Sequence, residues 1–327
     1  MPFIANSTYQ PPFFFRHYHL NTIYPALLRN VSGVNYERET IDTPDDDFID
    51  LDWSKMGNGK QVVLVLHGLE GSADRHYIRG MIRQFNEQGW DGVGKNFRSC
   101  SGRPNRQKRS YHMGASDDLE VVINHLISIG YEEIIVVGFS LGANVTLKYL
   151  GEQGTRLPPQ VKAGVAFSVP LHIVSANLYI NRPRNKLYLK RFLDSLNEKV
   201  RIKATLYPEL KELIPAQLPR DFTEFDDIFT GPIHGFKDAH DYWIQTSSKQ
   251  FLPNINVPTL IVNALDDSFL SPQCYPHAEA EANNLLYLET PKHGGHVGFT
   301  TWGRTFWSEQ RAWAFVKEKT QSRTTVK

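Results

Sequence analysis

Short apolar runs rich in β-branched residues recur along the chain, and each is bounded by glycine, proline or polar residues. This pattern is typical of strands that are buried on both faces of a sheet. The clearest runs cover residues 62–66, 134–137, 161–167 and 259–262, and weaker candidates lie at 92–97 and 285–288. The spacing of these runs leaves room for a helix between most neighbouring strands.

Helical periodicity fills two of these intervals. Apolar residues follow the i, i+3, i+4, i+7 pattern in 78–85 and again in 119–127, where Ser116 or Asp117 is expected to cap the helix. Strands that alternate with such helices predict an α/β fold with a mostly parallel sheet covered on both faces. The segments near 34–41 and 48–53 instead predict an antiparallel hairpin at one edge of that sheet.

The stretch at about 171–250 interrupts the alternation. It has no convincing strand pattern, and its tyrosine, phenylalanine and leucine residues fall on expected helices. We therefore expect a single domain over residues 1–327, with a helical cap inserted between strands at about 171–250. Neither internal repeats nor low-complexity tracts argue for a second unit.

Composition and charge narrow the choice of partner. The chain is 41% hydrophobic with a formal net charge of +1, which gives no sign of a nucleic-acid-binding surface. Cys100 and Cys274 are too few for a disulfide framework, so a reducing compartment is expected. We expect no nucleic-acid partner, and the sequence does not indicate an oligomeric state.

No apolar run reaches the roughly 20 residues that a membrane span needs. The most apolar N-terminal piece is Phe13–Phe15, and the N-terminus lacks the basic-then-apolar layout of a signal peptide. These features predict a cytoplasmic protein without an integral membrane segment. The phenylalanine run leaves open a loose contact with a membrane surface.

The strongest chemical signal is the run IIVVGFSLGANVTLKYL at 134–150. A strand pattern leads into Gly138-Phe139-Ser140-Leu141-Gly142, and a helical pattern follows. This is the G-x-S-x-G nucleophile elbow of α/β hydrolases in its strand–turn–helix context. The glycines permit a sharp turn that exposes the Ser140 hydroxyl, and the following helix N-terminus favours developing negative charge.

An oxyanion hole is expected beside this serine. The strand at 62–66 ends in His67-Gly68-Leu69, and in this fold the loop at that place contributes one backbone N–H, while the residue after the nucleophile contributes the other. Leu69 and Leu141 are the predicted donors. His67 is expected to be a buried histidine that bonds loop backbone.

The general base and its carboxylate should follow the serine in the order Ser, Asp or Glu, His. The strand at 259–262 runs out into the adjacent pair Asp266 and Asp267, and either could orient a histidine. Of the later histidines, His277 falls in an expected helix and should face solvent. That leaves His293 and His296, two glycines apart, as the candidate base and a neighbour.

The chain resembles the YheT-like α/β hydrolases, also called AB hydrolase family 4, over about residues 19–300. The resemblance implies a triad of Ser140, Asp267 and His296 that hydrolyses carboxylic esters with lipid-like or short-to-medium acyl groups, without metal or cofactor. One departure is Ser268, where the family commonly has proline after the Asp pair. The blocks that carry it are HLNTIYPALLR (19–29), HGLEGSADRHYIRGM (67–81), NFRSCSGRPNR (96–106), YHMGASDDL (111–119), GFSLGANVTLKYLGEQG (138–154), EFDDIFTGPIHGFKDAHDYW (224–243), NALDDSFLSP (263–272) and GGHVGF (294–299).

Other functions remain open at this stage. The same triad could act on thioesters or transfer acyl groups, and an H-x-x-x-x-D spacing at His112 and Asp117 is sometimes linked to acyl transfer. We interpret Asp117 instead as a helix cap with His112 as its loop partner. A non-catalytic binding protein of the same fold is a further alternative. A metallohydrolase built on His293 and His296 is disfavoured because two intervening glycines oppose a helix.

Overall fold

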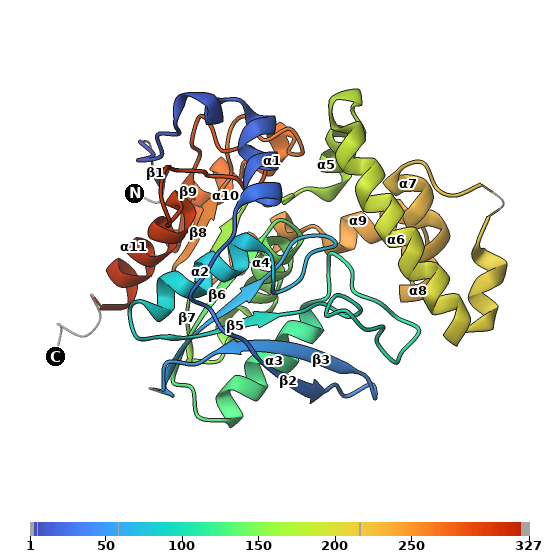
Figure 1. The fold of residues 1–327 in the computed structure, drawn as a ribbon, viewed down its shortest axis with the longest axis horizontal. Helices are drawn as coiled ribbons and strands as arrows, with labels where there is room; N and C mark the ends of the chain where they lie inside the picture. The colour runs from blue at the N-terminus through green and yellow to red at the C-terminus, as the bar shows by residue number, and fades with distance from the viewer. Residues whose placement is uncertain (1–2, 5, 58, 216, 322–327) are drawn as a thin grey trace.

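A nine-stranded, mostly parallel β-sheet runs through the centre of the described part of the chain (Figure 1). The computed structural model describes residues 3–4, 6–57, 59–215 and 217–321. Across the sheet the strands follow the order β1-β9-β8-β7-β6-β4-β5-β3-β2. The strands are β1 (Phe3–Ile4), β2 (Glu37–Asp42), β3 (Phe48–Ser54), β4 (Gln61–Leu66), β5 (Asp91–Lys95), β6 (Glu133–Phe139), β7 (Val161–Phe167), β8 (Thr259–Val262) and β9 (Leu286–Glu289).

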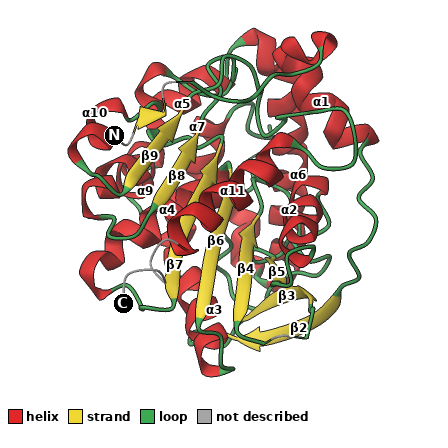
Figure 2. Cartoon of the chain, turned by 90° about the vertical axis from the view of Figure 1, so that its left-hand side faces the viewer, coloured by secondary structure: helices red, strands yellow, loops and turns green. Residues whose placement is uncertain are grey.

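Helices cover both faces of this sheet (Figure 2). The helices of one face are α2 (His76–Asn86) and α11 (Trp307–Gln321), and those of the other are α3 (Ser116–Ser128) and α4 (Leu141–Gln153). Successive side chains of a strand point to opposite faces. Val63 of β4 therefore belongs to the core cluster under α2 and α11, and Leu64 belongs to the cluster under α3 and α4.

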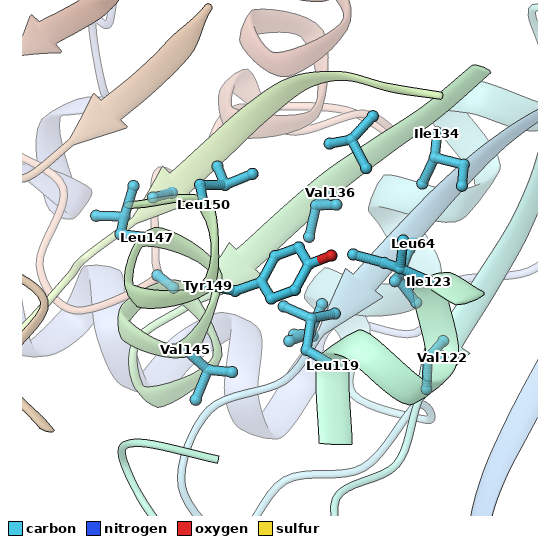
Figure 3. Packing of buried hydrophobic residues seen from close by; sticks show 14 of the residues in the cluster. Leu64, Leu119, Val122, Ile123, Ile134, Val136, Val145, Leu147, Tyr149 and Leu150 are labelled. Carbon is cyan, nitrogen blue, oxygen red and sulfur yellow. The ribbon is translucent and has the colours of Figure 1, made fainter. Parts of the chain in front are cut away.

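Aliphatic side chains dominate the core on the α3 and α4 side. Figure 3 shows Leu64 and Val136 pointing from the sheet toward Leu119 and Ile123 of α3, with the Tyr149 ring of α4 beside them. All five residues are at most 1% exposed. Burial on this scale stabilises the fold by about 1.5–3 kcal/mol for each large side chain. The strand-and-helix pattern of the sequence thus matches the packing that holds β6 and α4 in place on either side of Ser140.

The remaining helices belong to the N-terminal segment, to the connection between β7 and β8 and to the segment before β9. The N-terminal segment holds a 3₁₀ turn (Phe13–Arg16) and α1 (Tyr18–Leu28), and α10 spans His277–Ala282. Between β7 and β8 the structure has α5 (Ile173–Ile180), α6 (Lys186–Leu206), α7 (Phe222–Phe225), a π-helical turn (Asp226–Thr230), α8 (Gly231–His234) and α9 (Ala239–Thr246). Short 3₁₀ turns cover Gly154–Arg156, Pro183–Asn185, Pro208–Leu213, Ser248–Asn254 and Pro272–Cys274. We call the segment 171–250 the cap.

The predicted strands are confirmed, with shifts of a few residues at their ends. The predicted edge hairpin is also confirmed, because β2 pairs antiparallel with β3, which in turn pairs antiparallel with β5. The predicted N-cap of the helix at 119–127, Ser116 or Asp117, is wrong. Helix α3 already includes Ser116 and Asp117, and Ala115 occupies the capping position. The Ser116 hydroxyl instead donates a hydrogen bond to the Glu152 carboxylate, 2.6 Å away, and does not cap the backbone amides of the first turn.

Sequence periodicity gave no indication of β1, α1 or α11. Helix α1 contains Pro25 and buries Asn21, so its inward face is not apolar. No helix in the described residues is both long and apolar enough to cross a bilayer. Cys100 and Cys274 are buried and unbridged.

The parallel strands bring their carboxyl ends to one edge of the sheet. Leu66 of β4 pairs with Gly138 of β6, and Val262 of β8 pairs with Phe167 of β7. The residues that follow β4, β6, β8 and β9 therefore emerge side by side. This edge is where ligands bind in open α/β sheets.

Lys95, the last residue of β5, is fully buried, and its Nζ has no hydrogen-bond partner among the described residues. The ammonium lies 4.1 Å from the centroid of the Phe97 ring. Burial lowers the pKa of Lys95 to about 8. A charged group that is buried without an ion partner weakens a fold.

Replacing Lys95 with methionine is expected to raise the free energy of unfolding, and the gain should shrink as pH rises. Because the folded pKa is below the unfolded value, the unfolded chain binds more protons between pH 8 and 10, so wild-type stability rises there. The gain at pH 7 should exceed that at pH 9.5 by about 2 kcal/mol. Urea unfolding at both pH values measures this, with the exposed Lys317→Met as control. A gain independent of pH would contradict the explanation.

Candidate active site

Ser140 occupies the sharp turn between β6 and α4. Its backbone adopts φ 53° and ψ −116°, a conformation that L-residues other than glycine rarely take. The Ser140 amide donates to the Phe167 carbonyl at 2.9 Å, which ties the turn to the neighbouring strand. The turn lifts the hydroxyl out of the sheet at the N-terminus of α4.

Gly138 and Gly142 are required by close backbone approach. A Cβ at Gly138 would lie 2.4 Å from the Gly142 carbonyl oxygen, and a Cβ at Gly142 would lie 2.5 Å from the His67 carbonyl oxygen. A side chain at Gly138 would push the first turn of α4 away from the end of β6, and a side chain at Gly142 would push the elbow away from β4. The G-x-S-x-G pattern is therefore a packing requirement of this turn as well as a sequence signature.

The structure brings Ser140, His296 and Asp267 together in one hydrogen-bonded chain. His296 Nε2 lies 2.9 Å from Ser140 Oγ, and His296 Nδ1 lies 2.8 Å from Asp267 Oδ2. A carboxylate can only accept, so Nδ1 carries the hydrogen and Nε2 is free to accept from the serine hydroxyl. The Asp267 side chain is fully buried, and that of His296 is 11% exposed. This arrangement can deprotonate Ser140 as it attacks an electrophile.

Asp266 and His293 form a separate pair beside this chain. Asp266 Oδ1 accepts a hydrogen bond from the Gly295 amide at 2.9 Å, and His293 Nδ1 lies 3.5 Å from Asp266 Oδ2. Burial raises the pKa of Asp266. The two carboxylates of the Asp266–Asp267 pair thus contact different histidines, and Asp266 holds the backbone of the loop that carries His296.

The loop that carries His296 is fixed by contacts from distant parts of the chain. The His296 amide donates to Thr22 Oγ1 of α1 at 2.9 Å, and the next amide, of Val297, donates to Ser168 Oγ at 2.9 Å. Gly295 has φ 55°, and a Cβ there would meet Thr22 Oγ1 at 2.5 Å. Thr22 was not predicted, because no local pattern marks a residue 274 positions away as a partner of the His296 loop.

The backbone amides of Leu69 and Leu141 are the free donors beside Ser140. In the turn after β4, the Gly68 and Glu70 amides donate to the hydroxyls of Tyr77 and Tyr111, at 3.1 and 2.9 Å. Neither Leu69 nor Leu141 donates its amide to an acceptor in the described part of the chain. Two free amides next to a nucleophile are the arrangement that stabilises an oxyanion.

His67 is confirmed as a structural histidine. It is fully buried, its Nδ1 donates to the Gly68 carbonyl at 2.7 Å, and its Nε2 accepts from the Phe97 amide at 3.1 Å. Burial lowers its pKa to about 3. A neutral ring with both nitrogens engaged shapes the turn before Leu69 and has no free nitrogen for proton transfer.

Glu70 links this turn to the cap, and sequence reasoning missed it. Its carboxylate accepts hydrogen bonds from Tyr111 Oη at 2.5 Å, from Lys199 Nζ at 2.8 Å and from the Ser195 hydroxyl. Ser195 and Lys199 belong to α6, whereas Glu70 directly follows Leu69 and has φ 53°. The position of the Leu69 amide is therefore coupled to the seating of α6.

Glu70→Gln is expected to lower kcat about tenfold and to change KM little, since a loosened Leu69 amide would stabilise the oxyanion less while leaving ground-state binding intact. Steady-state kinetics on a chromogenic ester test this, together with inhibition by a trifluoromethyl ketone. The inhibitor forms a tetrahedral adduct, so its affinity should fall in proportion to kcat/KM. An unchanged affinity of the folded variant for the inhibitor would limit Glu70 to a role in stability. Lys199→Met removes the same contact from the α6 side and is the matched variant.

A cavity of about 180 Å³ opens between Ser140 and the cap. Leu69, Leu141, Phe269 and His296 line its floor. The walls from the cap are mostly apolar: Ile173, Ile180, Phe192, Leu196, Val200, Phe222, Phe225, Ile233, Tyr242 and Trp243. Such a lining fits a hydrocarbon chain better than a polar group.

Asp226 is the carboxylate in this apolar wall. It lies in the π-helical turn, where it accepts from Thr230 Oγ1 at 2.6 Å and from Trp243 Nε1 at 2.8 Å. Burial raises its pKa to about 7. The wall of the cavity can therefore change charge near neutral pH.

His112 and Asp117 are not bonded to each other. Asp117 pairs with Arg109 at 2.7 Å, and His112 Nδ1 accepts from the Gly114 amide at 3.1 Å. The interpretation of Asp117 as the N-cap of the helix with His112 as its loop partner is therefore wrong, because the Asp117 carboxylate pairs with Arg109 and Ala115 is the N-cap. Burial holds the pKa of His112 well below its usual value.

Comparisons with known proteins agree with this architecture. A family model described as "alpha/beta hydrolase fold" matches residues 61–301. The Escherichia coli K12 protein named "Putative esterase YheT" is 35% identical over 91% of this chain and 88% of its own length. Mouse "Phospholipase ABHD3" is 28% identical over 90% of this chain and 74% of its own length. The Pyrococcus furiosus esterase Pf2001 superposes with a TM-score of 0.57 at 19% identity, covering 89% of this chain and 98% of that one.

Proposed function

Because the model of the α/β-hydrolase fold matches residues 61–301, the chain belongs to this family, and we propose that it is a serine hydrolase that cleaves carboxylic esters. One observation carries the proposal. It is the hydrogen-bonded chain from Ser140 through His296 to Asp267, which opens into an apolar cavity. We assign Ser140 as nucleophile, His296 as general base and Asp267 as the carboxylate that orients it.

Catalysis proceeds in two steps in this proposal. His296 takes the Ser140 proton as Oγ attacks the ester carbonyl, and the Leu69 and Leu141 amides stabilise the oxyanion. Collapse of the tetrahedral intermediate expels the alcohol, which receives its proton from His296, and leaves an acyl-enzyme. A water molecule that His296 deprotonates then attacks the acyl-enzyme and releases the acid.

The apolar cavity supports an acyl chain of short to medium length as the bound group. The relatives named esterase and phospholipase act on esters, which is consistent with a lipid-like substrate for this chain. In the proposal, the cap forms the wall against which the acyl chain packs. The single predicted domain over 1–327, with a cap at 171–250, remains part of this proposal.

Covalent labelling combined with an ester series tests the proposal. A fluorophosphonate should modify Ser140 and no other serine, as peptide mass spectrometry would detect, and Ser140→Ala should remain unlabelled. p-Nitrophenyl esters from C2 to C16, with matched thioesters and with added alcohol, should give hydrolysis of the oxygen esters as the main reaction. A wild-type protein that is neither labelled nor active on any ester would refute the assignment. Faster thioester cleavage or net alcoholysis would shift it to a thioesterase or an acyltransferase.

Asp226 is expected to make the acyl preference depend on pH. Since its pKa is about 7, the carboxyl is neutral below that value and charged above it, and a charge in the wall disfavours a hydrocarbon chain. The ratio of kcat/KM for C8 to that for C2 should fall several-fold from pH 6 to pH 8.5. Taking the ratio cancels any effect of pH that is common to the two substrates. In Asp226→Asn the ratio should stay flat, and a wild-type ratio that is already flat would contradict the prediction.

A further inference from the structure

Helix α1 exposes the side chains that a surface helix normally buries. Its buried residues are Asn21 and Pro25, whereas Leu27 and Leu28 are 72% and 71% exposed. An amphipathic helix of a globular protein usually turns its apolar stripe to the core. The inverted arrangement leaves a face of α1 that only a partner would cover.

Other exposed aromatic residues extend this face. Phe13 and Phe14 are 75% and 67% exposed in the preceding turn, and Trp302 is 70% exposed. The ring of Phe15, which anchors that turn in the fold, lies 5.6 Å from the Trp302 ring and 4.8 Å from the Tyr24 ring of α1. The exposed aromatic residues therefore lie beside α1, and clusters of exposed apolar side chains of this kind mark interaction sites.

The N-terminal part of the cap borders this surface. His19 Nδ1 of α1 lies 2.9 Å from Tyr188 Oη of α6. The ring centroids of His19 and Tyr188 are 5.6 Å apart, so the start of α6 packs against α1. In Figure 1, α1 and α5 lie at the same end of the molecule, and α6 starts there.

The stretches that carry these apolar and basic residues contain no acidic residues. The sequence has no aspartate or glutamate in residues 1–36 or in 153–193, although acids and bases nearly balance over the whole chain. Arg184, Lys186 and Arg191 are exposed and form no salt bridge in the described part of the chain. Lys190 in the same stretch is paired with Asp194. This combination suits an anionic surface rather than a protein of mixed charge.

The same surface adjoins the site of Ser140. Tyr188 packs on Phe269 with ring centroids 5.0 Å apart, and Phe269 packs on His296 at 4.3 Å. Thr22 of α1 also holds the His296 amide. A flat partner resting on α1 and the start of α6 would thus lie close to His296 and the Ser140 site.

We propose that residues 13–28 and Trp302, together with the basic stretch 182–191, form a docking face for an anionic lipid bilayer. Aromatic and leucine side chains enter the boundary between headgroups and acyl chains, while the arginine and lysine side chains remain at the headgroup level. Each cation near the surface adds to binding through the negative surface potential. The docking face can be tested separately from the proposed ester hydrolysis, since none of the exposed side chains named for it belongs to the Ser140–His296–Asp267 chain.

Vesicle flotation of the full chain tests the docking face. Vesicles of phosphatidylcholine alone and of phosphatidylcholine with 30% phosphatidylglycerol serve as probes. We expect binding to the anionic vesicles, weakening with salt, and little to the neutral ones. Phe14→Ser/Leu28→Ser and Arg184→Glu/Lys186→Glu should each lower the partition constant by about tenfold or more. The controls Ile129→Ser and Lys317→Glu change exposed residues elsewhere and should bind as wild type does.

Three results would overturn the proposal. They are absence of binding to both kinds of vesicle, binding that both double variants retain, and a wild-type dimer in sedimentation that the double variants dissociate. The last would assign the face to a second copy of the chain. Circular dichroism and melting temperature establish that the variants are folded. Ser140→Ala should bind vesicles as wild type does, so the result is independent of whether the ester-hydrolase proposal holds.

Discussion

Ser140→Ala and His296→Ala are each expected to lower kcat on a chromogenic ester by about 10⁵- to 10⁶-fold, and the double variant should be no slower than either. The reason is that the two groups act as one unit. Without the serine there is no nucleophile for the base to activate, and without the base the hydroxyl keeps its proton at neutral pH. Stopped assays at high enzyme concentration, with active-site titration of the wild type, provide the dynamic range.

His293→Ala is the matched control for this prediction. His293 lies three residues before His296 on the same loop, but its ring faces Asp266 rather than Ser140. Its removal should change kcat by less than about threefold, the effect of a neighbour that only touches the loop. If His293→Ala were as inactive as His296→Ala, the assignment of the base would be wrong, and both histidines would have to act on the reaction.

The sequence predicts those parts of the site that local rules determine. A strand, a glycine-bounded serine and a helix follow each other at 134–150, so the elbow can be recognised without any tertiary contact. The same holds for the turn after β4, because His67 and Gly68 directly end a strand pattern. The alternation of strands and helices along the chain also follows from periodicity alone. Strand ends shift by a few residues, as in the predicted segment 92–97, which extends past Lys95, the last residue of β5.

The parts that were not predicted depend on contacts between residues far apart in the chain. Thr22 supports the His296 loop across 274 residues, and Glu70 reaches Ser195 and Lys199 in the cap. A threonine in α1 or a glutamate in a turn has no local pattern that separates it from a solvent-exposed residue. The prediction of the N-cap of α3 was wrong for a related reason, because the Ser116 hydroxyl donates to the Glu152 carboxylate of α4.

Several long-range contacts hold strained backbone in place beside the site, which a local sequence pattern cannot predict. Ser140 and Glu70 adopt backbone conformations with positive φ, at 53° each, and such strain persists only when surrounding contacts over-determine it. The Phe167 carbonyl holds Ser140, while α6 and Tyr111 hold Glu70. These two positions are the proposed nucleophile and the residue next to a predicted oxyanion donor, where misplacement by an ångström would affect the rate most.

Asp267→Asn is expected to lower kcat by about 10⁴-fold, and Asp266→Asn by far less. The Asp267 carboxylate accepts from His296 Nδ1 at 2.8 Å and from the Phe269 amide at 2.9 Å. An asparagine can satisfy the Phe269 amide with its oxygen and then offers its NH₂ to the imidazole. The imidazole would move its hydrogen to Nε2, so it could no longer accept the Ser140 proton.

Asp266→Asn provides the discriminating comparison, because the two acids are adjacent and the substitution is identical. An asparagine oxygen at 266 can still accept from the Gly295 amide, so the loop that carries His296 should keep its place. We expect a change in kcat of less than about tenfold, with a small loss of stability. kcat for both variants, measured with the fluorophosphonate labelling rate of Ser140, reports directly on the activation of the nucleophile. Equal losses would mean that the pair acts on His296 as one group, and a larger loss in Asp266→Asn would reassign the acid.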